Sequence, residues 1–160
     1  MALETAATEV INAETLLNHW QGHRRLTRRV IEAFPEDEIF NFSLGGMRPF
    51  SEMVWELIRM TIPVVDGVST GKWAEFTGEK PAVKSELLRL WDAQTAKLNE
   101  KFLQIPLRRF HEVDKAFGQW ECAGLFTIQY AIDNEIHHRG QGYVYLRALG
   151  IEPPPFWERN

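Results

Sequence analysis

The strongest constraint on the fold is a long helical pattern at residues 123–149. Side chains spaced three and four apart lie on one face of an α-helix. One such stripe here consists of Phe126, Tyr130, Asn134, His138, Gln141, Tyr145 and Leu149. Gly150 and the three prolines that follow Glu152 predict that the helix ends near Leu149. Because the stripe is apolar at both ends and polar at its centre, we expect polar groups inside a helical core, where they need partners or a ligand.

Three further amphipathic helices are predicted at residues 12–34, 50–65 and 81–103. Ser51 is the expected N-cap of the second helix, and Pro63 is expected to kink or end it. Pro81 is expected in the first turn of the third helix, where a residue without an N–H is tolerated. The inward positions of the first helix are Leu16, Trp20, His23, Thr27, Val30 and Phe34.

The connections between these helices are marked by glycine and proline, at residues 35–49 and 66–80. Trp73 and Phe76 are expected to anchor the second connection to the core. Residues 107–121 are expected to be irregular or short extended structure. Four amphipathic helices without a convincing strand predict an all-α fold, a four-helix bundle, as a single domain spanning residues 1–160.

Composition argues against several classes of protein. The chain is 44% hydrophobic and 25% charged, as is typical of globular proteins. No apolar run approaches the ~20 residues of a membrane-spanning helix, and residues 1–10 lack the regions of a leader, so we expect a cytoplasmic protein with no membrane partner. The net charge of −4 disfavours nucleic acid as a partner. We expect Cys122 to be a small buried residue, and we expect a solvent-facing cluster at Arg24, Arg25, Arg28 and Arg29.

Two histidine clusters have spacings that suit metal or substrate binding. Asn134 and His138 lie four apart on one helix face, so they can share a metal ion or a substrate group, with His137 beside them. His19 and His23 form another pair four apart, for which a structural role is the main alternative. The polar run of the last helix is open to two interpretations, a structural network and a working site.

Glu56 is the third candidate, because it lies between Met53 and Met60 on the apolar stripe of the second helix. A carboxylate there is costly unless it is paired or ligated. A structural ion pair with Arg139 or Arg147 is as good an interpretation as ligation.

The C-terminal segment carries a specific motif. It reads Glu135-Ile136-His137-His138-Arg139-Gly140-Gln141, followed by Tyr145-Leu146-Arg147 and Gly150. This motif resembles the signature that closes the DinB/YfiT-like family of metalloenzymes. The likeness extends back to the entry of the second helix at Arg48-Pro49-Phe50-Ser51-Glu52, and it therefore spans most of the chain.

The resemblance implies a four-helix bundle that holds a divalent metal, such as nickel or zinc, with a histidine triad. By position, His138 matches the second histidine of the His-x-x-x-His pair, Asn134 matches the first, and Glu56 matches the ligand from the second helix. We therefore expect Glu56, Asn134 and His138 to converge in the bundle interior. Their oxygen ligands also suit manganese or magnesium, and the alternative is a site that has lost its metal and kept its pocket.

The same resemblance implies a thiol-dependent S-transferase or a metal-dependent hydrolase that acts on a small molecule, with a low-molecular-weight thiol as a possible cosubstrate. The ion would lower the pKa of a bound thiol or water, and His137 or Gln141 would orient the substrate. The alternative is a non-catalytic binding or stress-associated protein. In both cases we expect a homodimer, for which Phe156 and Trp157 are candidate anchors.

Overall fold

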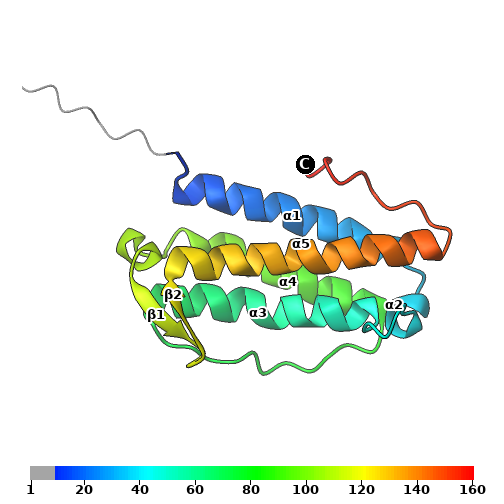
Figure 1. Cartoon of the computed structure of the whole chain (residues 1–160), viewed down its shortest axis with the longest axis horizontal. Helices are drawn as coiled ribbons and strands as arrows, with labels where there is room; N and C mark the ends of the chain where they lie inside the picture. The colour runs from blue at the N-terminus through cyan, green and yellow to red at the C-terminus, as the bar shows by residue number, and fades with distance from the viewer. Residues whose placement is uncertain (1–9) are drawn as a thin grey trace, which may run out of the picture.

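The computed structural model describes residues 10–160, so the expectation about a leader at residues 1–10 lies almost wholly outside the described residues. The chain folds as an all-α bundle of four long helices, shown in Figure 1. These helices are α1 (Ala13–Ala33), α3 (Phe50–Thr70), α4 (Lys84–Phe102) and α5 (Gly124–Ala148), with a short α2 (Glu38–Asn41) between the first two. None of the helices in the described range is long and apolar enough to cross a membrane.

The prediction for α1 is confirmed in its bounds and in its buried face. Asn12 caps the helix, because its side-chain oxygen accepts a hydrogen bond from the backbone N–H of Thr15 at 2.8 Å. Trp20, Thr27 and Val30 are all buried, as the spacing predicts.

The predicted start of α3 at residue 50 is confirmed, but the predictions for its N-cap and for its end are wrong. Ser51 is not the N-cap, because the helix begins at Phe50 after Pro49. Pro63 does not end the helix, which continues to Thr70 and is closed by Gly71 in the left-handed region at φ 73°. The second half of α3 buries Val64, Val65 and Val68, and this packing outweighs the hydrogen bond that a proline removes.

The connection between α3 and α4 covers residues 71–83 instead of the expected 66–80, because α3 ends later and α4 begins later than expected. Pro81 lies outside α4, which begins at Lys84. Trp73 anchors the connection as predicted, because its ring packs directly over Gly67, where a Cβ would approach the indole to 2.1 Å. Phe76 packs edge-on against Trp55, with ring centroids 5.6 Å apart.

Residues 107–121 contain short extended structure, which is one of the two expectations for this segment, together with a 3-10 turn. A 3-10 turn at Leu107–Phe110 leads into a small antiparallel hairpin of β1 (Val113–Ala116) and β2 (Trp120–Ala123). In its register, Val113 lies opposite Ala123 and Ala116 lies opposite Trp120. The hairpin leads directly into α5, and it is the only sheet among the described residues.

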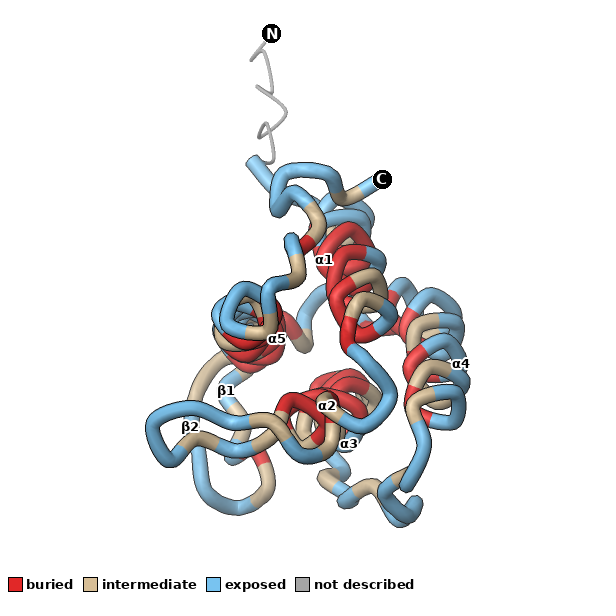
Figure 2. The backbone as a smooth tube through the Cα atoms, turned by 90° about the vertical axis from the view of Figure 1, so that its right-hand side faces the viewer, coloured by how far each residue is buried: buried red, intermediate tan, exposed pale blue. Residues whose placement is uncertain are grey.

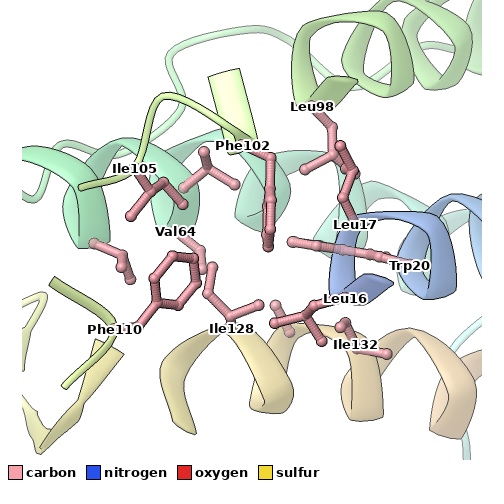
Figure 3. Close-up of a cluster of buried hydrophobic side chains, with 13 residues drawn as sticks. Leu16, Leu17, Trp20, Val64, Leu98, Phe102, Ile105, Phe110, Ile128 and Ile132 are labelled. Atoms are coloured by element: carbon pink, nitrogen blue, oxygen red, sulfur yellow. The ribbon is translucent and has the colours of Figure 1, made fainter. Parts of the chain in front are cut away.

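The long helices surround a core, and the buried residues, red in Figure 2, lie on the sides of the helices that face it. Helices α1 and α3 each contact both α4 and α5, so α1 and α3 lie diagonally across the bundle. Two apolar clusters fill the two ends. Figure 3 shows the first, where Trp20 meets Phe102 edge-on at 6.2 Å, and the second contains Phe34 stacked on Phe50 at 4.7 Å.

The inward face of α5 differs from the predicted stripe at its start. Phe126 and Tyr130 are exposed by 62% and 60%, whereas Glu135 and Arg139 are buried. The expectation of a solvent-facing arginine cluster on α1 is also wrong for Arg24, which is fully buried.

Candidate functional site

The three residues predicted to converge do lie together, between α3 and α5. One carboxylate oxygen of Glu56, Oε1, is the focus: Nδ2 of Asn134 donates a hydrogen bond to it at 3.1 Å, and Nε2 of His138 lies 3.2 Å away. The site is at the edge of the bundle and not in its interior as expected, because the Glu56 side chain is 37% exposed. We refer to Glu56, Asn134 and His138 as the Glu56 centre.

A fourth residue, Arg48, reaches the same carboxylate from the loop before α3. Its Nη2 donates to Glu56 Oε2 at 2.7 Å. The alternative interpretation, a structural ion pair of Glu56 with Arg139 or Arg147, is wrong in its partner, because Arg48 makes the ion pair. Partial burial raises the pKa of Glu56, but the hydrogen bonds from Arg48, Asn134 and His138 outweigh it and hold the pKa below its usual value. Glu56 is therefore a carboxylate anion at neutral pH.

Gln141 fixes the orientation of the His138 ring. Its amide nitrogen donates to Met47 Sδ at 3.4 Å, which turns its amide oxygen towards His138 Nδ1 at 2.8 Å. With the amide in this orientation, Nδ1 is the ring nitrogen that donates, and Nε2 points at the Glu56 carboxylate. In this tautomer Nε2 presents a lone pair to Glu56 Oε1 at 3.2 Å, an arrangement that suits a shared cation. In the other tautomer Nε2–H donates to the carboxylate and no cation is needed.

The donor set of the Glu56 centre fits a divalent ion, although not a histidine triad. An imidazole nitrogen, a carboxylate oxygen and an amide oxygen suit the harder first-row ions better than the pure nitrogen set does. The second ring nitrogen of a ligating histidine ordinarily donates to an oxygen, as His138 does to Gln141. Within residues 10–160 no group of three or more His, Cys, Asp or Glu side chains is placed to hold a metal, so a third protein ligand at this centre would have to be the Asn134 amide.

The other predicted site residues lie around this centre or away from it. His137 is exposed, with its ring centroid 5.1 Å from that of His138. His19 and His23 contact each other edge-on at 4.6 Å, but they belong to a different part of the molecule. His23 is buried, and its Nδ1 and Nε2 lie 3.0 Å and 3.1 Å from the guanidinium groups of Arg139 and Arg159. Burial first, and then Arg139, lowers the pKa of His23 to about 3.

A second polar cluster, centred on Glu135, was not predicted. Glu135 accepts hydrogen bonds from Trp20 Nε1 at 3.1 Å and from Thr27 Oγ1 at 2.7 Å, and Arg24 Nη1 lies 3.8 Å away. We refer to Glu135 and these three partners as the Glu135 cluster. Helical spacing could have indicated this cluster, because Arg24 lies four residues after Trp20 and three residues before Thr27 on the inward stripe.

Arg24 is fully buried, and each of its side-chain nitrogens has a hydrogen-bond partner. Its three nitrogens donate to Thr95 Oγ1, Thr61 Oγ1 and the Trp91 carbonyl at 3.0, 3.3 and 3.1 Å, and its guanidinium lies 3.4 Å from the Trp91 ring centre. Burial lowers its pKa to about 10 against the opposing effect of Glu135, so it stays charged at neutral pH. The site residue Arg48, by contrast, lies in a loop, where no periodicity indicates it.

Comparison with known proteins places this architecture in one family. The sequence model of the DinB family matches residues 72–159, more than half of the chain, and the chain belongs to the DinB family. The matched segment includes Asn134 and His138 but not Glu56.

Its relatives share the whole fold. The uncharacterised protein YjoA of Bacillus subtilis (strain 168) is 22% identical over 148 residues, which cover 91% of this chain and 96% of YjoA. The crystal structure of YjoA superposes with a TM-score of 0.74 over 91% of this chain and 98% of its own. A DinB-like protein from Bacillus cereus ATCC 10987, 20% identical, gives a TM-score of 0.65 over 89% of this chain and 95% of its own. At these identities the likeness establishes the fold.

Proposed function

We propose that this DinB-family protein binds one divalent metal ion at the Glu56 centre and is a metal-dependent enzyme acting on a small molecule. The observation that carries the proposal is the arrangement of His138, whose Nδ1 is held by Gln141 while Nε2 faces the Glu56 carboxylate. With Nδ1 donating to Gln141, a cation shared by Nε2 and the carboxylate would account for their 3.2 Å contact. A manganese or magnesium ion suits the oxygen ligands, and nickel or zinc is the choice that the family likeness favours.

In this proposal the ion would lower the pKa of a bound thiol or water, as an S-transferase or a hydrolase needs. The residues of the chain position it. Gln141 orients His138, and Asn134 contributes its amide once that group is turned to present oxygen. Arg48 is half exposed beside the centre, where its guanidinium suits an anionic group of a substrate, such as a carboxylate. His137, on the outer side, remains a predicted substrate contact.

One observation favours a second candidate, a non-catalytic binding protein. Arg48 already neutralises Glu56 at 2.7 Å, and a doubly protonated His138 would complete the hydrogen bonds without a metal. In that case the Glu56 centre is a charged hydrogen-bond network.

Elemental analysis of tag-free protein, purified without added metal, separates the two. The enzyme proposal predicts about one manganese, nickel, zinc or magnesium ion per chain in the wild type. His138→Ala should remove it, whereas Asn134→His should restore a histidine pair and tighten zinc or nickel binding. Loss of thiol-transfer or hydrolase activity on chelation, regained on metal addition, would complete the test.

His111→Ala is the matched control, because His111 is exposed and lies away from the centre. Wild-type protein without bound metal, or an equal metal content in wild type and His138→Ala, would contradict the enzyme proposal and leave the binding protein.

A further inference from the structure

A groove lies between the start of α1 and the first half of α5, two helices that contact each other along the bundle in Figure 1. Its lining comes from residues 11–19 and 129–133, and we refer to it as the α1–α5 groove. Its volume is about 400 Å³, and sites for small molecules have about 300–1,000 Å³. Asp133 lines this groove, whereas the next residue, Asn134, points to Glu56 on α3. The groove is therefore separate from the Glu56 centre.

The floor of the α1–α5 groove is apolar and firmly packed. Leu16 of α1 and Ile132 of α5 line it, and both side chains belong to the first core cluster, as Figure 3 shows. They are only 8% and 3% exposed. Ile11 adds an exposed apolar side chain to the lining. An apolar group placed in the groove would remove water from this surface, which favours binding.

The rim of the groove is polar and carries a negative charge. Thr15 and His19 lie four residues apart on α1, Gln129 and Asp133 lie four residues apart on α5, and all four are exposed. Residues at this spacing share one helix face, so the two pairs face each other across the floor. Each of these side chains can accept a hydrogen bond, and the lining contains no Lys or Arg. Asp133 makes no ion pair with any residue from 10 to 160.

A second hollow, of about 430 Å³ between α1 and α4, lacks this combination. Its lining includes both Arg25 and Asp92, and Asp92 is already paired with Arg28 at 2.7 Å. It has no buried apolar side chain at its base. An apolar floor beneath a rim of acceptors with one unpaired carboxylate is thus a feature of the α1–α5 groove.

We propose that the α1–α5 groove binds a small organic cation, a protonated amine joined to an apolar body. The apolar body covers Leu16 and Ile132, and the ammonium group lies beside the Asp133 carboxylate. An ammonium group has three N–H donors, and the acceptors of the rim match them. The hydrogen bond to Asp133 is the strongest of these, because both partners are charged. This site does not depend on a metal ion at the Glu56 centre.

An NMR titration of the whole chain with 2-phenylethylamine at pH 7 tests the site, with EDTA present so that no metal ion takes part. The backbone amide signals of residues 11–19 and 129–133 should shift and saturate, with a Kd on the order of 1 mM. 2-Phenylethanol and phenylacetate have the same ring but a neutral and a negative group. The alcohol should bind about tenfold more weakly than the amine, and phenylacetate should cause no saturable shift.

Three variants separate the role of the charge from the role of the floor. Asp133→Asn should weaken binding of the amine about tenfold and leave binding of the alcohol unchanged. Gln129→Trp, at an exposed position, should fill the groove and abolish binding of both, while amide signals far from the groove stay in place and show that the fold is intact. Glu100→Gln is the matched control, because it removes an exposed carboxylate from α4 and should leave amine binding as in the wild type.

Absence of saturable shifts at these residues in the wild type would overturn the proposal. Equal affinities for the amine and the alcohol would also overturn it, because Asp133 would then not select a cation. An equal loss of amine binding in Asp133→Asn and Glu100→Gln would mean that only the overall charge of the protein attracts the amine, which contradicts a built site.

Discussion

The Glu56 centre and the Glu135 cluster are two polar groups built around a carboxylate, and both use residues of α5 less than two turns apart. They differ in access to solvent: Glu135 is 1% exposed, whereas the Glu56 side chain is 37% exposed. They also differ in completeness. Trp20, Thr27 and Arg24 surround Glu135, whereas the role of His138 as donor or acceptor towards Glu56 depends on its tautomer.

This difference distinguishes a stabilising cluster from a candidate ligand site along one helix. A buried charge that loses its partner is strongly destabilising, so the Glu135 cluster fixes how α1 packs on α5. A half-exposed carboxylate is solvated on one side, so the Glu56 centre contributes little to stability and is open to a ligand. Interior polarity alone therefore does not distinguish a structural network from a candidate site; access to solvent does.

The largest predicted effect comes from Glu135→Ala. It leaves the guanidinium of Arg24 buried without its counter-charge and removes the acceptor for Trp20 and Thr27. The free energy of unfolding should fall by about 3–5 kcal/mol, as measured by urea denaturation at pH 7.

Glu56→Ala is the matched variant on α3, and its cost should be at most about 1 kcal/mol because the ion pair with Arg48 is half exposed. Equal losses of stability in the two variants would show that the comparison between the clusters is wrong.

A smaller effect, on the pH dependence of stability, is predicted for His23, which lies next to Arg24 and close to Arg139. Its pKa is lowered from 6.5 to about 3 in the folded protein, so the unfolded chain binds a proton between these values and the folded protein does not. The contribution of His23 to stability is complete above pH 6.5 and is lost as the pH falls towards 3. The wild type should therefore lose stability between pH 7 and pH 4.5, and His23→Gln should lose less.

His111→Gln is the control for this experiment, because His111 is exposed at the end of the 3-10 turn. Chemical denaturation at the two pH values gives the comparison. An equal fall in the wild type and in His23→Gln would mean that other groups set the acid sensitivity.

Helical spacing predicted the fold, and together with the family resemblance it predicted that the residues of the Glu56 centre converge, but it predicted poorly where packing overrides local preference. The bounds of α1 and the end of α5 followed from periodicity and from Gly150. Pro63 was misread because buried valines beyond it continue α3. Arg24 was assigned to solvent because arginine is usually exposed, and only the partners on α3 and α4 show why it is buried.

The metal proposal is tested most directly by the stability of metal-free protein as a function of added Mn²⁺. An ion that binds only the folded protein raises the free energy of unfolding by ~2.7 kcal/mol when its concentration is one hundred times its Kd. We predict that urea denaturation will show this rise in the wild type and its absence in His138→Ala. An unchanged stability in the wild type, or the same rise in His138→Ala, would contradict a metal ion at the Glu56 centre.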